Sequence, residues 1–173
     1  MAKTVLLLRH AKSSRDDPEM ADFDRPLTGR GRRDAPRMGE WMTGAGLKPD
    51  LVLCSDARRA RETWAGLSET LRNPAPVLYE RGLYMASAKA LCRRLQRLPS
   101  TVGSVLVIGH NPGLEEAAEA LADGGGEALE RLRRKYPTAA LARLEFDVSD
   151  WARLEPGTGR LTQFTTPGEL TAG

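Results

Sequence analysis

The sequence has few of the residues that would indicate a metal centre, a redox motif or a surface for nucleic acids. Of 173 residues, two are cysteine, two are histidine and 5% are aromatic. Cys54 and Cys92 are too far apart for a metal-type or redox-type spacing, so a reducing cytoplasm is the expected location. Scarce aromatic side chains for base stacking and a net charge of only +3 argue against nucleic acid as a partner.

Long hydrophobic runs are missing as well. The apolar stretch at the amino terminus ends at Arg9 and is too short for the core of a signal peptide. No other run approaches the length of a membrane-spanning helix. With 40% hydrophobic and 28% charged residues, the composition is typical of a soluble globular protein. We therefore expect a single domain over residues 1–173, without a membrane partner, as a monomer or weak dimer.

The sequence does contain short apolar runs that alternate with segments of helical periodicity. Residues 4–8 and 104–109 are continuous and β-branched, as expected of parallel strands buried on both faces, and residues 50–55 and 76–80 are weaker examples. This alternation predicts an α/β fold, a three-layer sandwich with a mainly parallel central sheet flanked by helices. One expected helix begins after the capping residue Thr28 and ends near Gly44. Three others cover residues 57–72, 87–98 and 114–122.

The pattern changes in the carboxyl-terminal third of the chain. Residues 138–146 alternate between apolar and polar, and a glycine-containing turn separates them from residues 160–165, which predicts a hairpin or an addition to the sheet edge. Three consecutive glycines indicate a flexible loop at residues 123–127. Residues 123–135 and 73–76 are the only candidates for an insert that could cover a site.

The two histidines have matching settings. His10 follows the strand expected at residues 4–8, and His110 follows the strand expected at residues 104–109. Ligands of open α/β sheets bind at the carboxyl edge of the strands, where both histidines should lie. Arg9 beside His10 would repel a metal cation, and the chain has neither a G-x-S-x-G elbow nor a Walker A loop. Guanidinium groups that converge on an imidazole suit a phosphoryl group, which a neutral imidazole can attack.

Three short segments, in order along the chain, resemble the signatures of the histidine phosphatase superfamily, whose fold is phosphoglycerate mutase-like. "LLLRHAKSS" (6–14) resembles the R-H-G motif with Ala11 in place of glycine, and "CSDARRARET" (54–63) resembles S-x-x-x-R-A-x-x-T. "VIGHNPG" (107–113) supplies the second histidine. "RHAKS" and "DRPLTGRGRRDA" (24–35) are similar to the SixA-like branch, small bacterial proteins associated with phosphohistidine phosphatase activity.

The resemblance implies a role for each matching residue. His10 would be the nucleophile and would carry a transient phosphohistidine. Arg9, Arg59 and His110 would form the phosphate pocket and stabilise charge on the phosphoryl oxygens during in-line transfer. Neighbouring arginines should lower the pKa of His10 and keep it neutral, whereas His110 would be more useful as a charged donor.

Further residues are candidates for additional roles in this scheme. Many superfamily members carry a carboxylate general acid after the strand that ends here in Glu80, although a strand terminus of this kind can also be merely solvated. Lys12 and Ser13 are candidates for secondary phosphate contacts, with an exposed loop as the alternative. Arg58 and Arg61 flank the motif arginine and are expected on the surface.

The sequence therefore predicts a metal-independent, cofactor-free phosphatase that acts through His10 on a phosphohistidine protein. Short inserts favour a protein substrate, because a large partner must reach His10. One alternative is a phosphatase for a small phosphorylated metabolite. Another is a non-catalytic module that binds phosphate or phosphopeptides, which would not require a nucleophilic histidine. Asp16 replaces the phosphate-binding Asn of the mutases and argues against mutase activity.

Overall fold

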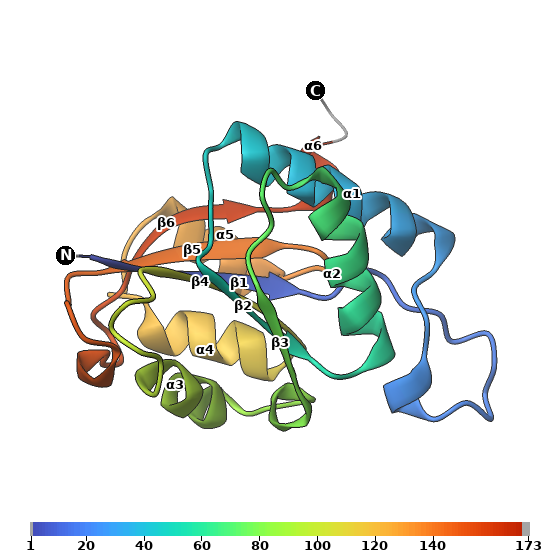
Figure 1. The fold of residues 1–173 in the computed structure, drawn as a ribbon, viewed down its shortest axis with the longest axis horizontal. Helices are drawn as coiled ribbons and strands as arrows, with labels where there is room; N and C mark the ends of the chain where they lie inside the picture. Colours follow the sequence, from blue (N-terminus) through green and yellow to red (C-terminus); the bar gives the residue numbers. More distant parts are fainter. Residues whose placement is uncertain (1, 171–173) are drawn as a thin grey trace.

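The computed structural model describes residues 2–170 as one six-stranded sheet with helices on both faces (Figure 1). The strand order is β3-β2-β4-β1-β5-β6. The first four strands are mutually parallel, whereas β5 is antiparallel to β1 and β6 is antiparallel to β5. The sheet is therefore mixed, mostly but not entirely parallel. Its strands are β1 (Lys3–Arg9), β2 (Leu51–Ser55), β3 (Val77–Glu80), β4 (Ser104–Gly109), β5 (Leu141–Phe146) and β6 (Arg160–Thr165).

The helices form the two outer layers. They are α1 (Gly29–Gly44), α2 (Arg58–Thr70), α3 (Ala88–Gln96), α4 (Gly113–Leu121), α5 (Glu127–Arg134) and α6 (Pro167–Leu170), with short 3-10 turns η1 (Asp22–Asp24), η2 (Arg81–Leu83) and η3 (Trp151–Arg153). Val5 and Leu7 pack into a cluster with α3, α4 and α5, and Leu6 and Leu8 pack with α1 and α2. Because successive side chains point to opposite faces, a strand covered on both sides is apolar throughout.

The segment after β1 is anchored to the start of α1. The Thr28 side chain accepts a hydrogen bond from the Gly31 amide, and the Thr28 amide donates to the Lys12 carbonyl. A Cβ atom at Gly31 would lie 2.3 Å from that carbonyl oxygen, so only glycine fits there. These contacts hold Lys12, at the start of the loop after His10, against Thr28, where the loop ends and α1 begins.

Two expectations for the carboxyl-terminal third have different outcomes. The hairpin is present, since β5 and β6 pair antiparallel and β6 is an edge strand. The loop expected at residues 123–127 is present up to Gly126, but residues 123–135, a candidate for an insert over a site, do not form one. Residues 127–134 form α5, and Leu129 and Leu132 are buried in the core beside α4. The helix is short and follows three glycines, so its period was not evident from the sequence.

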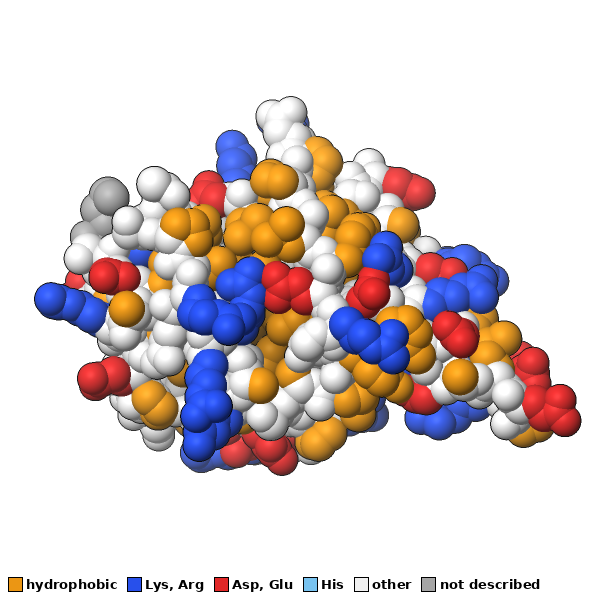
Figure 2. All heavy atoms as spheres, turned by 60° about the horizontal axis from the view of Figure 1, so that its bottom comes forward, with side chains coloured by type: hydrophobic (Ala, Val, Ile, Leu, Met, Phe, Trp, Pro, Cys, Tyr) orange, Lys and Arg blue, Asp and Glu red, His pale blue; other side chains and the backbone are white. Residues whose placement is uncertain are grey.

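The surface of the described chain carries charges of both signs. On the face in Figure 2, Lys and Arg side chains lie in several separate groups, with Asp and Glu side chains between or beside them. Arg58 and Arg61 are about half-exposed, as expected for the residues that flank the motif arginine. The helices within residues 2–170 are too short or too polar to span a bilayer.

Candidate active site

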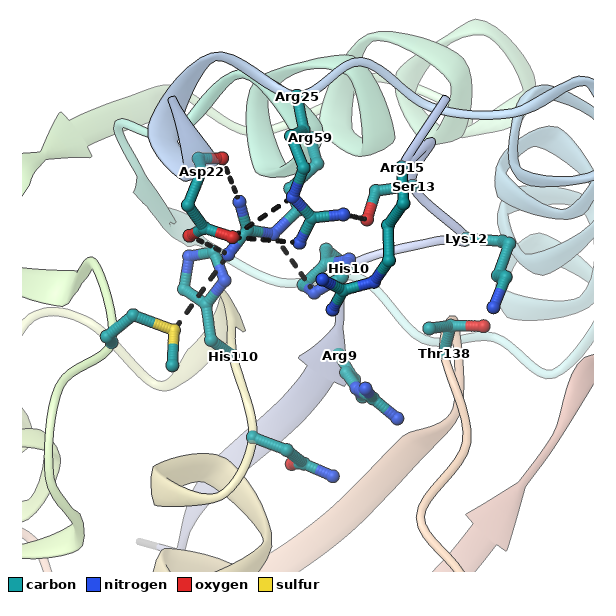
Figure 3. Close-up of a pocket in the computed structure, with 12 residues that line it drawn as sticks. Arg9, His10, Lys12, Ser13, Arg15, Asp22, Arg25, Arg59, His110 and Thr138 are labelled. Atoms are coloured by element: carbon teal, nitrogen blue, oxygen red, sulfur yellow. Dashed lines mark hydrogen bonds and ion pairs between the residues drawn. The ribbon is translucent and has the colours of Figure 1, made fainter. Parts of the chain in front are cut away.

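The three signature segments meet at the carboxyl edge of β1, β2 and β4 (Figure 3). β1 and β4 are parallel neighbours, and Arg9 lies opposite Gly109 in their register. The next residue on each strand is a histidine, so His10 and His110 leave the sheet at equivalent positions. Their ring centroids are 5.1 Å apart. Both side chains are buried, and both line one pocket.

His10 presents its Nε2 atom to the pocket. Its Nδ1 lies 2.7 Å from the Ala11 carbonyl oxygen, which can only accept, so Nδ1 carries the hydrogen and Nε2 keeps a lone pair. The Arg59 Nε–H donates to that Nε2 at 3.3 Å. Burial, assisted by the nearby His110 and arginines, lowers the pKa of His10 to about 3. The ring is therefore neutral at physiological pH.

His110 is turned the other way. Its Nε2 lies 2.7 Å from the Ser55 hydroxyl oxygen, which itself accepts from the Ala57 amide. Among the described residues, Nε2 is the only acceptor in reach of the Ser55 hydroxyl hydrogen, which places the ring hydrogen of His110 on Nδ1. Nδ1 is buried and has no hydrogen-bond partner among the described residues. Burial, and then the Arg59 charge, lower the pKa of His110 to about 3. His110 is thus a neutral donor here, not the charged donor expected from the sequence.

Four guanidinium groups line the pocket, those of Arg9, Arg15, Arg25 and Arg59. The Arg9 Nη1 donates to the Tyr136 carbonyl, and its buried Nε has no hydrogen-bond partner among residues 2–170. Arg59 is 2% exposed and directs Nη1 and Nη2 to the backbone carbonyl and carboxylate of Asp22. Arg25, which the sequence did not single out, pairs with the same carboxylate. The site is therefore strongly electropositive, with one carboxylate among its lining residues.

The two candidates for secondary phosphate contacts differ in what they touch. Lys12 lines the pocket with an exposed side chain, and its ammonium group has no partner within the described chain. The Ser13 hydroxyl also lines the pocket but accepts a hydrogen bond of 2.6 Å from Arg25 Nη1. Lys12 is thus available to an anion directly, whereas Ser13 orients an arginine.

Glu80 is not brought into this pocket. It ends β3, and its two carboxylate oxygens each accept a hydrogen bond of 2.8 Å from Arg94 on α3. This ion pair raises the pKa of Arg94. The pocket-lining residues do not include Glu80. The geometry therefore gives no support to the expectation that Glu80 is the general acid, because the side chain is directed to α3.

The second signature connects the other two. Besides the contacts of Ser55 with His110 and of Arg59 with His10, Thr63 joins two backbones. Its hydroxyl accepts from the Ala11 amide at 2.9 Å and donates to the Arg59 carbonyl at 2.7 Å. The serine, arginine and threonine of S-x-x-x-R-A-x-x-T therefore each contact a neighbour of the site. We did not predict roles for the serine and threonine, although the motif itself contained that signal.

Asp22 and Tyr84 were also missed. Asp22 lies on η1, in the loop between β1 and α1, and its Oδ2 accepts from the Tyr84 hydroxyl at 2.5 Å. That hydrogen bond, with the charges of Arg59 and Arg25, holds the pKa of Asp22 well below its usual range. Several acidic residues share this loop, so only the tertiary contact distinguishes Asp22. Within residues 2–170, no group of three or more His, Cys, Asp or Glu side chains is placed to hold a metal ion.

Comparison with known proteins relates this site to one family. Residues 5–84 match the model of the histidine phosphatase superfamily (branch 1). An uncharacterised protein of Mycobacterium tuberculosis is 37% identical over 163 residues, with 92% of this chain and 99% of that protein covered.

Two solved structures share the fold over nearly their whole length. A putative phosphohistidine phosphatase SixA from Nakamurella multipartitia is 28% identical, with a TM-score of 0.85 over 96% of this chain and 97% of that one. The protein histidine phosphatase SixA complexed with tungstate is 25% identical, with a TM-score of 0.79 over 96% and 99%. Together with the ordered signatures and the pocket that they form, these similarities show that the chain belongs to the histidine phosphatase superfamily.

Proposed function

We propose that the protein is a metal-independent phosphatase that acts through a covalent phosphohistidine on His10. The observation that carries this proposal is the state of His10, a buried neutral imidazole whose Nε2 lone pair faces the pocket beside Arg59. Two further donors, the Arg9 Nε–H and the His110 Nδ1–H, are buried at the same site without partners among the described residues. A nucleophile and convergent donors are what phosphoryl transfer requires.

The reaction has two halves. In the first, the His10 Nε2 lone pair attacks phosphorus in line, a P–N bond forms, and the bond to the leaving group breaks with its electron pair on the leaving atom. Arg9, Arg59 and His110 stabilise the charge on the phosphoryl oxygens. In the second half, water attacks phosphorus, the P–Nε2 bond breaks, and inorganic phosphate leaves with a proton lost to solvent. His10 returns to its neutral form.

We propose a phosphohistidine protein as the substrate. Asp22 is the carboxylate among the pocket-lining residues, and its lowered pKa keeps it ionised, so it does not supply a proton to the leaving group. A phosphohistidine ring that carries a hydrogen on its second nitrogen leaves as a neutral imidazole and needs no further proton, whereas the alkoxide of an alkyl phosphate is a much poorer leaving group without one. The similarity to the SixA proteins supports the same choice. The packing of α5 into the core, away from the pocket, favours a large substrate.

The test compares wild type with His10→Ala on three substrates in the presence of EDTA. We expect the wild type to hydrolyse p-nitrophenyl phosphate and a phosphohistidine protein, and to act poorly on a small alkyl phosphate. His10→Ala should release no phosphate from any of them. If the wild type hydrolyses none of the three substrates, the enzyme proposal fails. Loss of turnover in EDTA would refute the metal-independent mechanism. Activity on the small alkyl phosphate without activity on the phosphohistidine protein would refute the choice of a protein substrate.

A further inference from the structure

Asp22 occupies an unusual position for a carboxylate in an anion site. It lies in the wall of the pocket, with a side chain that is 47% exposed, opposite the buried guanidinium of Arg59 (Figure 3). Its Oδ2 accepts from Arg59 Nη2 at 3.0 Å and from the Tyr84 hydroxyl. Its Oδ1 accepts from Arg25 Nε at 3.0 Å, and Arg25 Nη2 lies at the same distance. Both oxygens are thus fully used by donors of the site.

These donors are of the kind that would bind a phosphoryl group. Carboxylates and phosphates both accept paired N–H groups from the edge of a guanidinium, so they compete for the same arginine. The donors of the pocket therefore fall into two classes. Arg9 Nε and His110 Nδ1 have no hydrogen-bond partner within residues 2–170. Arg59 Nη2 and the Nε and Nη2 atoms of Arg25 are instead paired with the Asp22 carboxylate.

We propose that Asp22 is an internal competitor for the phosphate site, which limits how tightly the pocket retains inorganic phosphate after each turnover. The inference rests on the proposed function, because phosphate is the product of that reaction. With both histidines neutral, a single carboxylate lies among five cationic lining residues, Arg9, Lys12, Arg15, Arg25 and Arg59. Without that carboxylate, a phosphate dianion would meet only cationic charges in the pocket wall and dissociate more slowly.

If Asp22 competes with phosphate, its removal should change phosphate affinity in the opposite direction from that expected if Asp22 only positions Arg59. If Asp22 only oriented Arg59, its loss would weaken phosphate binding and raise KM. If Asp22 competes, its neutralisation tightens phosphate binding, and slower product release lowers kcat together with KM. The sign of the change in phosphate affinity therefore decides between them.

The experiment measures the Kd of inorganic phosphate by isothermal titration calorimetry for wild type, Asp22→Asn and Asp22→Ser. Releasing charge-assisted hydrogen bonds of Arg59 and Arg25 should lower the Kd about tenfold in both variants. Asp22→Glu, which restores a carboxylate, should return it toward the wild-type value. Asp24→Asn is the matched control, because Asp24 lies on the same turn, is exposed, and makes no side-chain hydrogen bond or ion pair within the described chain. It should change the Kd less than twofold.

The outcomes separate the two proposals. If folded Asp22→Asn and Asp22→Ser, checked by circular dichroism, bind phosphate no more tightly than wild type, internal competition is refuted. An equal tightening in Asp24→Asn would also refute it, because a general charge effect would then suffice. Calorimetry requires no turnover. If the Asp22 variants bind phosphate more tightly but the wild type hydrolyses no substrate, competition is supported and the phosphatase proposal is refuted. If the wild type is active but the variants bind phosphate no more tightly, only competition is refuted.

Discussion

His10 and His110 leave neighbouring parallel strands at equivalent positions, yet their imidazole rings expose opposite nitrogens. The Ala11 carbonyl accepts a hydrogen bond from Nδ1–H of His10, which leaves Nε2 as an acceptor. The Ser55 hydroxyl faces Nε2 of His110, which leaves Nδ1 as a donor. One ring is thus prepared to attack and the other to donate.

The difference teaches that the partner of each ring, not the residue type or its place on the strand, assigns the role. A carbonyl can only accept, and the Ser55 hydroxyl hydrogen has no acceptor other than His110 Nε2 among the described residues. Both rings are neutral because both are buried among arginines. Four predictions test this comparison, from the largest expected effect to the smallest.

Asparagine substitutions should separate the two histidines most clearly. An Asn side chain can supply an N–H near the position of Nδ1 but offers no nucleophilic nitrogen. His10→Asn and His10→Ala should therefore both reduce turnover to background. His110→Ala should lower kcat by a factor of about 10² to 10³, as for other lost transition-state donors, and His110→Asn should recover part of this loss. Equal activity of His110→Asn and His110→Ala would contradict the donor role of Nδ1.

Acid should destabilise the fold through both rings. Each pKa falls from 6.5 to about 3 on folding, so the unfolded chain takes up protons below pH 6.5 that the folded chain refuses. Stability is then complete above pH 6.5 and decreases as the pH falls toward 3, by roughly 2 kcal/mol per histidine at pH 5. Urea unfolding at pH 7 and pH 5 measures this loss. His110→Asn should show about half of it, and an unchanged pH dependence would contradict the neutral state of His110.

Ser55→Ala should affect His110 and leave His10 unchanged. Without the hydroxyl, the Nδ1–H form of His110 is no longer selected, and we expect kcat to fall about tenfold, as for one lost hydrogen bond. Nitrogen NMR of the imidazoles gives a direct measure. In wild type it should show hydrogen on Nδ1 of both rings, and Ser55→Ala should alter only the His110 signals. A change at His10 alone would contradict the pairing described for the two rings.

Glu80→Gln should have the smallest effect. The carboxylate pairs with Arg94 outside the pocket, so turnover should change less than about twofold, and the partly exposed ion pair should contribute about 1 kcal/mol to stability. Arg94→Gln is the matched variant, since it breaks the same pair from the other side. A loss of activity of about 10² in Glu80→Gln alone would restore the general-acid role expected from the sequence.

The sequence predicted the parts of the molecule that depend on local pattern. The continuous apolar run before each histidine indicated a strand buried on both faces, and the alternation in residues 141–146 indicated a strand of another kind. The Thr28 cap and the exposure of Arg58 and Arg61 could likewise be predicted from the sequence, because they depend on neighbours within a few residues.

The rest depends on contacts between distant segments. Asp22 shares its loop with Asp16, Asp17 and Asp24, and nothing in their order distinguishes the one that reaches Arg59. Glu80 ends its strand as expected, but the direction of its side chain depends on where α3 packs. The tautomer of His110 follows from a serine 55 residues away. Pattern along the chain does not contain such information.

The contacts that assemble the site also have a consequence for folding. Thr63 lies 52 positions from Ala11, which it contacts, and Arg59 lies 49 positions from His10. β1 itself lies between β4 and β5, so its two neighbours are synthesised long after it. Contacts so distant in sequence form slowly, because the intervening chain must be closed first. Activity is therefore expected to be the last signal to recover on refolding, and a nascent chain that already carries His10 and Arg59 should remain inert until its last strands arrive.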